Sequence, residues 1–481
     1  TARYAGIGIT GVQFNTITSD EAFSNPFIVR TSTRVRDFEL VAKTYTSMEA
    51  FYIGDDWKFH KDWMFSAGAR WDYEQAYNAD GGTYIKFNSF FDNLAPRFGL
   101  AWDFTGKGKG KVFINYATEI QVPIPLDVNV RAAGGNSQTD KNFNVNRYSA
   151  PTNATIATGF TPVNLGADAT PIDAGLKPPS IGEASGGIQY EVARDFTVEA
   201  RGVYRWERNV VEDGSFDDGD TYFLFNPGRR GSGTQTTTED LACGNPTIGC
   251  FGHAARYYRA LSFSATKRFT NNYQFIASYV YSSLTGNYEG LFRNDNGQSD
   301  PNITSLFDLV SLLKNLYGRL PNDRPHQFKF NGSYRTPWKL MISGNFYVQS
   351  GSPFNQLIPH PVYGNNEGFA VPRGTAIIPT VTAVQPGFPN IVNSIGATRT
   401  PTTMNLDLGF YYPIKVGEKH ELRLTGDWFN VFNSQRAVTL DQTYSLNSGV
   451  AGVPPVLNPF YGAALLVQAP SAFRFGAKFT F

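Results

Sequence analysis

The sequence lacks long hydrophobic runs. No apolar stretch reaches the roughly 18 residues that a membrane-spanning helix requires, and the mean hydropathy is slightly polar, which argues against a helical membrane protein. A membrane barrel stays open, because its strands are apolar only at alternate positions. A charge excess is also missing, since 42 Lys and Arg against 41 Asp and Glu give a net charge of +1. Without a basic surface field, nucleic acid is not an expected partner.

Cysteine is scarce: the chain has two, Cys243 and Cys250, in the segment CGNPTIGC. A disulfide between them would close a short local loop and stabilise the fold by about 2 to 2.5 kcal/mol on the chain-entropy model. We predict this disulfide, in an oxidising compartment, with two free thiols as the alternative. Two cysteines alone make no zinc site, and no C-x-x-C motif is present.

Aromatic residues and glycine, by contrast, are abundant. The 39 Phe, 25 Tyr and 47 Gly combine strand formers with turn formers and favour an all-β fold. At 481 residues the chain could hold several ordinary domains or one large all-β unit, since barrels often exceed the usual domain size.

Apolar and polar residues alternate in many segments, most clearly at the end of the chain. In an extended strand, one face would carry Phe473, Phe475, Ala477, Phe479 and Phe481. The opposite face would carry Arg474, Gly476, Lys478 and Thr480. The same division recurs upstream, for example in 196–207 and 404–412. The pattern predicts strands with one apolar and one polar face.

Short turns and long polar segments alternate along the chain. The short turns lie at 60–62, 106–110, 194–195, 271–272, 337–338 and 417–418. The long segments cover about 122–178, 209–254, 287–323, 352–400 and 435–469. This arrangement predicts about 14 strands, near 2–14, 40–59, 62–75, 94–105, 111–121, 180–193, 196–210, 255–269, 273–286, 324–336, 339–351, 402–416, 419–433 and 470–481.

Many of these strands exceed the 5 or 6 residues usual in globular sheets and are long enough to cross a bilayer. Tilted antiparallel strands, tight turns on one side and long loops on the other are typical of outer-membrane barrels. Closure of such a barrel removes the sheet edges, whose backbone N–H and C=O groups would find no hydrogen-bond partner in hydrocarbon. A soluble sandwich or propeller fits less well, because the spacing between short turns varies and no repeat of about 40 to 50 residues is present. We therefore predict a transmembrane antiparallel β-barrel over 1–481.

The polar face of the predicted strands carries charges of both signs. Its cations are Arg70, Arg97, Arg201, Arg205, Lys329, Arg335, Arg423 and Arg474. Its anions are Asp72, Asp103, Glu199, Glu207, Asp407 and Asp427. Opposite charges at facing or diagonal positions predict salt bridges along the wall of the barrel.

No motif predicts enzymatic chemistry. GKGKGK at 106–111 lacks the phosphate-loop spacing and is interpreted as a turn. The five histidines are scattered, so we expect no catalytic residue, no resident metal and no cofactor. We predict that the acidic segment 212–220 is a solvated loop; a Ca²⁺ site is the alternative, although the spacing of the carboxylates differs from that of an EF-hand. Segment 303–320 has apolar residues at helical spacing and predicts a short helix packed on neighbouring loops.

Four segments carry a family resemblance: YIGDDWKFHKDWMFSAGARWDYE (52–74), 92–120, 320–354 and 405–433. They resemble the barrel half of TonB-dependent outer-membrane receptors, and within these the Oar-like group, which carries a carboxypeptidase-regulatory-like domain. The resemblance implies a 22-stranded barrel, an N-terminal plug and a TonB box. The chain shows no plug features, so we expect the C-terminal portion of a larger receptor; an autonomous barrel of 14 or 16 strands is the alternative.

The resemblance implies energy-coupled import of a large or scarce ligand across the cell outer membrane. It implies as partners the TonB system, acting through a missing plug, the membrane lipids and lipopolysaccharide, and an unidentified extracellular ligand or surface protein. The long loops would be extracellular, and segments 222–227 and 354–366 are candidates for ligand contact. The ligand-binding residues themselves stay unknown. A structural or adhesive surface barrel and a passive porin are the alternatives.

The terminal aromatic residues have a separate interpretation. In outer-membrane barrels the last strand commonly carries alternate apolar residues and ends in an aromatic residue. The end of this chain resembles that pattern, which is the signal recognised by the barrel assembly machinery. By this resemblance, Phe473, Phe475, Phe479 and Phe481 form an assembly signal, and Phe481 faces lipid at the periplasmic rim.

Overall fold

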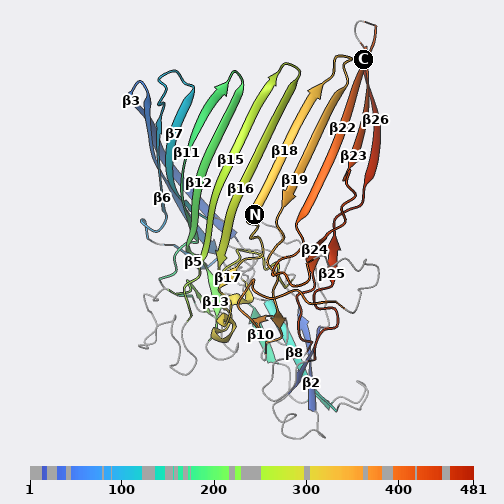
Figure 1. The fold of residues 1–481 in the computed structure, drawn as a ribbon. Coiled ribbons are helices and arrows are strands. Elements are labelled where there is room, and N and C mark those ends of the chain that lie inside the picture. Colours follow the sequence, from blue (N-terminus) through green and yellow to red (C-terminus); the bar gives the residue numbers. More distant parts are fainter. Residues whose placement is uncertain are drawn as a thin grey trace.

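One large antiparallel sheet dominates the computed structural model (Figure 1). The structure describes residues 13–18, 30–38, 45–77, 81–87, 89–121, 136–146, 155–156, 161–165, 172–173, 175–215, 223–228, 251–296, 304–360, 367–381, 394–417, 420–446 and 456–481. Within these residues no helix is long and apolar enough to span a membrane.

Thirteen long strands form the wall, and each pairs with the next long strand along the chain. They are β3 (Tyr45–His60), β4 (Trp63–Tyr77), β6 (Leu94–Trp102), β7 (Gly110–Ile120), β11 (Ser180–Ala193), β12 (Phe196–Asn209), β15 (Arg256–Thr270), β16 (Tyr273–Gly286), β18 (His326–Arg335), β19 (Met341–Gln349), β22 (Thr403–Val416), β23 (His420–Phe429) and β26 (Ala472–Thr480). Two short strands, β5 (Thr83–Lys86) and β17 (Gly318–Arg319), pair at the loop ends of β4 and β16.

The predicted all-β fold is confirmed, and thirteen of the fourteen predicted strands correspond to wall strands. The first predicted strand, 2–14, lies mostly outside the described residues; Gln13 and Phe14 belong to β1 (Gln13–Thr18) of a separate sheet. The short turns also lie where the sequence places them. At the turn between β15 and β16, Asn271 and Asn272 have φ angles of 55° and 69°, which asparagine tolerates better than most residues.

The GKGKG segment is a turn between β6 and β7, as predicted. Asp103 lies in this turn instead of on the wall, where the sequence placed it. Its carboxylate accepts hydrogen bonds from Thr105 Oγ1 at 2.6 Å and from the Gly108 amide at 2.6 Å. These hydrogen bonds, the one from the Thr105 hydroxyl first, hold the pKa of Asp103 below its usual range.

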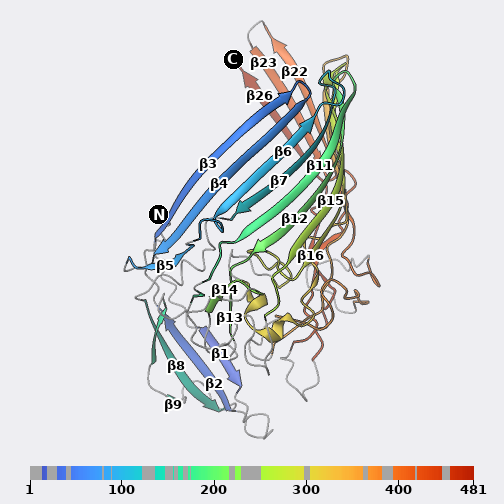
Figure 2. The same ribbon diagram turned by 90° about the vertical axis from the view of Figure 1, so that its left-hand side faces the viewer.

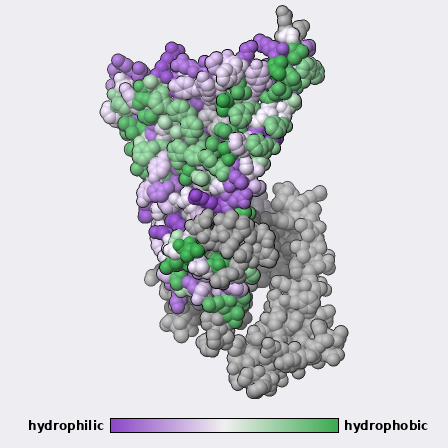
Figure 3. Space-filling model, turned by 45° about the vertical axis from the view of Figure 1, so that its right-hand side comes forward, coloured by the Kyte–Doolittle hydropathy of each residue, from purple (hydrophilic) through white to green (hydrophobic). Residues whose placement is uncertain are grey.

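The two faces of the wall differ in chemistry. We call the face that carries Phe263, Tyr279 and Phe328 in register the outer face, and the opposite, polar one the inner face. Figure 3 shows a green hydrophobic band over the wall with purple hydrophilic regions above and below it. Large apolar side chains are exposed on the outer face, including Phe475 with 82% of its surface accessible. Such a band is suited to contact with lipid.

Among the described strands, β3 and β26 are the two edges of the wall and do not pair with each other, so this part of the wall is open. Figure 2 shows the sheet curved like a trough. The short turns and the C-terminus lie at one end of the strands, and the long connections lie at the other (Figure 1).

The long connections pack into a layer of their own, which we call the loop layer. Apolar residues from three long connections meet in one buried cluster: Val210, Phe223, Phe225, Phe251, Ala254, Tyr288, Leu306, Phe307, Leu316, Leu357 and Phe369. A second cluster joins the end of β4 to Leu176, Val211 and Leu224, and a third joins Phe354 to Ile378, Leu440 and Ala464. Short hairpins reinforce the layer: β13 (Glu212–Gly214) with β14 (Phe223–Phe225), β20 (Leu357–Ile358) with β21 (Gly368–Phe369), and β24 (Ala437–Leu440) with β25 (Ala464–Val467).

The helix predicted over 303–320 is wrong. Only two short 3₁₀ helices form, η2 (Ser305–Phe307) and η3 (Val310–Leu313). Leu309 between them is extended and buried, because Ser215 donates its amide to Asp308 O at 2.8 Å and so ties this segment to β13. The prediction that the segment packs on neighbouring loops is confirmed, since Leu306 and Phe307 belong to the first buried cluster.

A separate five-stranded sheet lies beyond the loop layer in Figures 1 and 2. It contains β1, β2 (Arg30–Phe38), β8 (Asn136–Asn146), β9 (Thr155–Ile156) and β10 (Thr161–Leu165). The three last strands come from the connection 122–178, which the sequence predicted as a long polar loop.

Candidate functional site

The inner face presents a row of polar side chains across six strands. Register pairs join Gln274, Ser333, Ser343, Gly409, Asp427 and Arg474 from β16 to β26. A parallel row contains Ile276, Asn331, Asn345 and Asp407. Because side chains alternate across a strand, this two-residue spacing places both rows on one surface.

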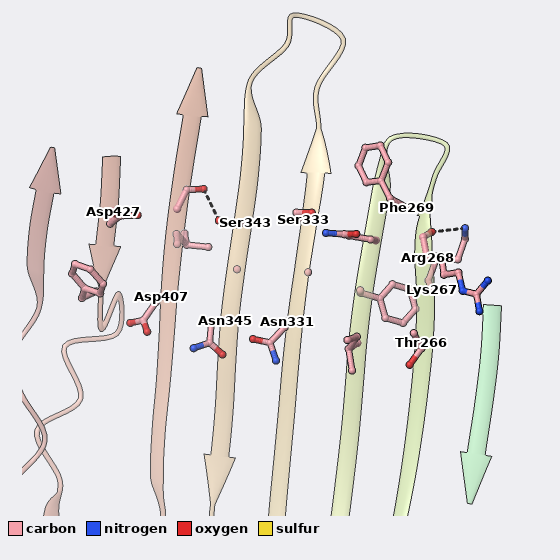
Figure 4. Close-up of a pocket in the computed structure, with 18 residues that line it drawn as sticks. Thr266, Lys267, Arg268, Phe269, Asn331, Ser333, Ser343, Asn345, Asp407 and Asp427 are labelled. Atoms are coloured by element: carbon pink, nitrogen blue, oxygen red, sulfur yellow. Dashed lines mark hydrogen bonds between the residues drawn. The ribbon is translucent and has the colours of Figure 1, made fainter. Parts of the chain in front are cut away.

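All members of the two rows except Arg474 line a hollow of about 660 Å³ on the inner face (Figure 4). Thr266 and Arg268 close it at the β15 side, and Asp427 and Phe429 at the β23 side. Ser343 donates its hydroxyl to Gly409 O at 3.3 Å, and a Cβ at position 409 would lie only 2.5 Å from Ser343 Oγ. Glycine is therefore required there for Ser343 to lie flat against β22.

Several polar groups of this inner-wall hollow are held by their neighbours. Asp407 accepts hydrogen bonds from Asn405 Nδ2 and from the Asn430 amide, both at 2.8 Å. The Ser333 hydroxyl, in contrast, is shielded from solvent and has no hydrogen-bond partner within the described residues. The surface can bind a polar segment or ligand through hydrogen bonds.

The predicted wall salt bridges form at several positions. Arg474 Nη2 lies 2.8 Å from Asp427 Oδ2 in the neighbouring strand, and Arg70 Nη2 lies 2.8 Å from Asp72 Oδ1 on the same face of β4. Arg205 pairs with Glu183, its register partner in β11. Glu183 was missed by sequence reasoning, although its alternating position in 180–193 could have revealed it.

A second group of charges is buried in the loop layer. Arg293 and Arg373 are both fully buried and share Asp295: Arg293 Nε lies 2.9 Å from Asp295 Oδ1, and Arg373 Nη2 lies 2.8 Å from Oδ2. Glu367 pairs with Arg293, and Glu289 pairs with Arg373. We call these five residues the loop-layer network. It joins the connections after β16 and β19.

Burial shifts the pKa values within the loop-layer network. Desolvation lowers the pKa of Arg373 to about 9, which leaves the guanidinium protonated at neutral pH. Burial raises the pKa of Asp295, and the neighbouring Arg293 opposes this shift. Phe369 packs against both cations, with its ring centre 5.0 Å from the Arg373 guanidinium and 5.5 Å from that of Arg293. Sequence reasoning missed this network, because its members lie in two separate long connections that carry no periodic pattern.

Glu212 forms another buried acidic site. It accepts hydrogen bonds from the Thr304 amide at 3.0 Å and from the Thr304 hydroxyl at 3.1 Å. Desolvation raises its pKa well above the usual range, and the nearby Asp213 and Asp308 act in the same direction. Glu212 and Asp213 are buried and therefore unsuited to the solvated acidic loop predicted from the sequence. Asp217, Asp218 and Asp220 lie outside the described residues.

The two segments proposed to contact a ligand are core segments where the structure describes them. Phe223, Leu224 and Phe225 are buried, as are Phe354 and Asn355. Sequence reasoning placed them correctly in loops but missed that the loops have a hydrophobic core. Tyr222 and residues 361–366 lie outside the described part of the chain.

Other predicted sites have different outcomes. Cys243 and Cys250 lie outside the described residues, so their disulfide stays a prediction. Among the described residues, no group of three or more His, Cys, Asp or Glu side chains is arranged to hold a metal ion. Phe473, Phe475 and Phe479 share the outer face of β26, and Phe481 follows with 91% of its surface accessible.

Alternating strands, a lipid-suited band, tight turns at one end and a loop layer at the other define an outer-membrane β-barrel protein. The outer membrane beta barrel domain family matches residues 87–450, and the chain belongs to this family. Its location is therefore the outer membrane, as predicted.

The chain is similar to the TonB-dependent transporter Oar of Myxococcus xanthus, with 28% identity over 519 aligned positions, covering 93% of this chain and 44% of that protein. Among solved structures it is similar to the ferric-catecholate import receptor Fiu of E. coli K12, with 11% identity, a TM-score of 0.48, and coverage of 96% and 53% of the two chains. It is also similar to the FrpB iron transporter of Neisseria meningitidis, with 11% identity, a TM-score of 0.47, and coverage of 96% and 50%.

The chain thus spans about half the length of the proteins that it matches. The resemblance to Oar-like TonB-dependent transporters is confirmed by the curated relative. That relative is a transporter, in agreement with the prediction that the chain is not an enzyme.

Proposed function

We propose that the chain forms part of the barrel of a TonB-dependent receptor that captures an extracellular ligand and imports it. The observation that carries the proposal is the inner face, where polar rows line a hollow across six strands. A barrel wall that faced only water would need no ordered hydrogen-bonding surface, whereas a plug segment packed against it would.

The open wall supports a larger barrel. Edge strands expose rows of backbone N–H and C=O groups, which cost several kcal/mol each in hydrocarbon if they stay unpaired. Strands β3 and β26 are such edges. In our proposal, additional strands pair with both of them and complete a closed barrel, and TonB acts on a plug inside it.

The orientation follows from connection length. Short turns face the periplasm and long connections face the cell exterior in outer-membrane barrels. The loop layer is therefore the extracellular end and the first part to meet a ligand. Its buried network and clusters hold the loops in fixed positions, and a ligand would contact their exposed residues.

Ligand uptake tests the proposal in cells that contain the complete gene. We expect accumulation of the ligand to fall to background when TonB is deleted, while surface binding persists. A matched variant, Ser333→Ala with Ser343→Ala, should reduce uptake with surface levels unchanged. Uptake that is unaffected by TonB deletion would contradict energy-coupled import and favour a passive channel. Surface binding with no uptake in either strain would favour an adhesive barrel.

The terminal aromatic residues are proposed to act in assembly by the barrel assembly machinery. Deleting Phe481 should lower the amount of receptor in the outer membrane several-fold, because the exposed outer-face aromatic row of β26 loses its last member. Quantitative immunoblotting of outer-membrane fractions measures this effect. Lys478→Gln, a change on the inner face of the same strand, is the control and should leave the level unchanged. Normal levels after Phe481 deletion would rule out the signal role.

A further inference from the structure

A pocket of about 710 Å³ lies in the loop layer, between the connection after β19 and the connection after β23. We call it the loop-layer pocket. Its walls come from segments 371–381 and 457–461, together with Gln356 and Tyr444, and none of the side chains that line it is charged. Arg373, the single charged residue of these segments, is fully buried in the loop-layer network instead. A charged group of a ligand would therefore find no ion-pair partner in this pocket.

Two tyrosines give the loop-layer pocket an aromatic wall. The ring centres of Tyr444 and Tyr461 are 5.2 Å apart, and the ring planes meet at 81°. Tyr461 donates its hydroxyl to Asn355 O at 3.3 Å, which fixes the ring in place. The next residue, Gly462, has a φ angle of 86°, and a Cβ there would lie 3.0 Å from Pro379. Glycine at this position therefore allows the two walls to approach each other closely.

The rim of the loop-layer pocket is apolar and exposed. Ile377 has 63% of its surface accessible, and Leu457 has 55%. The loop layer faces water in the proposed orientation, where each exposed Å² of apolar surface costs about 25 cal/mol. An apolar surface that stays in water beside a pocket is typical of a binding site.

Segment 375–381 also presents backbone groups to the loop-layer pocket. Ile378 forms two backbone hydrogen bonds of 2.9 Å with the chain at 396–397. Ala376 and Ile378 are buried and Ile377 is exposed, which is the alternation of an extended strand. Neighbouring residues of an extended chain direct their backbone groups to opposite sides, so those of Ile377 point away from 396–397. Within the described residues, the backbone of Ile377 forms no hydrogen bond.

A free strand edge beside a side-chain pocket is suited to an extended peptide, because main-chain hydrogen bonds supply affinity and the pocket supplies selectivity. We propose that the loop-layer pocket binds an extended, uncharged peptide segment. The backbone of the peptide pairs with Ile377, and an aromatic or proline side chain packs against Tyr444 and Tyr461. The assignment rests on the proposed function, because it names the class of ligand that the receptor captures.

Binding of synthetic heptapeptides to the purified full-length receptor in lipid nanodiscs tests the assignment. The probes are acetylated and amidated, carry Thr-Ser before and Ser-Thr after three central residues, and cover Pro, Phe, Tyr and Leu at the centre in all combinations. Two matched sets carry Glu or Lys in place of both serines. We expect binding by neutral peptides and about tenfold weaker binding by both charged sets, because the pocket offers no ion-pair partner.

Two substitutions at the exposed rim separate the two parts of the site. Ile377→Arg places a charge in the uncharged pocket and should weaken binding of the neutral peptides about tenfold. Ile377→Pro removes the backbone amide and should weaken it about fivefold, the loss expected for one hydrogen bond. The control Leu446→Arg adds the same charge at an apolar residue that is 58% accessible but does not line the pocket. Its affinity for the peptides should equal that of the wild type.

Hydrogen exchange of segment 367–381 reports whether each variant keeps the fold of the loop layer. Equal affinity for neutral and charged peptides would overturn the proposal, and so would unchanged binding in both Ile377 variants. Absence of binding by every neutral peptide would also overturn it. In that case, binding of the neutral fluorophore N-phenyl-1-naphthylamine to the wild type but not to Ile377→Arg would assign the pocket to a non-peptide ligand. Loss of uptake on TonB deletion would uphold the proposed function in either case, since it is measured in cells with the natural ligand.

Discussion

The strand wall and the loop layer differ in where their large apolar side chains lie. The wall exposes its large apolar residues on the outer face, whereas nearly all buried apolar residues of the described chain lie in the loop layer or at the strand ends beside it. The apolar side chains of the outer face contact lipid instead of a protein core, because lipid supplies apolar contacts that water cannot. The loop layer faces water and therefore needs a core of its own.

The charges follow the same division. On the wall, ion pairs such as Arg474 with Asp427 are largely exposed and make a small contribution. In the loop layer, Arg293, Arg373 and Asp295 are fully buried, where the loss of one partner leaves an uncompensated charge. The comparison predicts that similar substitutions have large effects in the loop layer and small effects in the wall.

The largest effect is expected from Arg373→Met. The substitution leaves Glu289 and Asp295 buried with one cation fewer, which should destabilise the loop layer locally by about 3 to 5 kcal/mol. Hydrogen exchange of segments 304–320 and 367–381 measures the change. Arg474→Met, the same substitution on the wall, is the control and should leave exchange in both segments unaltered. Equal protection in the wild type and in Arg373→Met would show that the network does not hold the loops together.

A smaller, pH-dependent effect is expected at Glu212. Its pKa in the folded protein is raised above the unfolded value by burial, so its contribution to stability is full below the unfolded pKa and is lost as the pH rises through the folded pKa. After correction for intrinsic rates, exchange in segment 304–316 should be slower at pH 5 than at pH 8. Glu212→Gln stays neutral and should flatten this difference, while Glu199→Gln, which changes a half-buried carboxylate of the wall, should not. A pH profile that is identical in the wild type and in Glu212→Gln would remove Glu212 from the explanation.

The smallest effect is expected from the wall pair Arg474 and Asp427. A double-mutant cycle with Arg474→Gln and Asp427→Asn should give a coupling free energy of about 0.2 to 1 kcal/mol, because both groups are partly solvated. Urea unfolding of the receptor in lipid vesicles measures it. A coupling above about 2 kcal/mol would show that the wall pair is shielded like the loop-layer network, and the contrast between the two regions would fail.

Sequence pattern predicted the wall well because the side-chain period of a strand is local. The nine residues from Phe473 to Phe481 are enough to predict a strand and the residues on each of its faces. Two adjacent asparagines are enough to predict the turn at 271–272. The helix expected over 303–320 failed for the converse reason. Its apolar spacing fits a helix, but Leu306, Phe307 and Leu309 pack against β13 and neighbouring connections, and these tertiary contacts hold part of the segment extended.

The candidate sites divide in the same way. The polar rows of the inner face follow from alternation plus strand order, and their members Asp407, Asp427 and Arg474 were predicted. The loop-layer network was not, because Glu289, Asp295, Glu367 and Arg373 meet across two long connections that carry no periodic pattern. Likewise, the aromatic segment Phe223–Phe225 was predicted to contact a ligand. In the structure it is buried and forms part of the core of the loop layer instead.

The sequence by itself therefore determined the barrel wall, its strand order, its lipid-suited face and its short turns, because all of these depend on neighbours one or two residues away. Tertiary structure alone decided how the long connections pack and which of their charges are buried. Those features join residues far apart in the chain, and no local periodicity encodes such contacts.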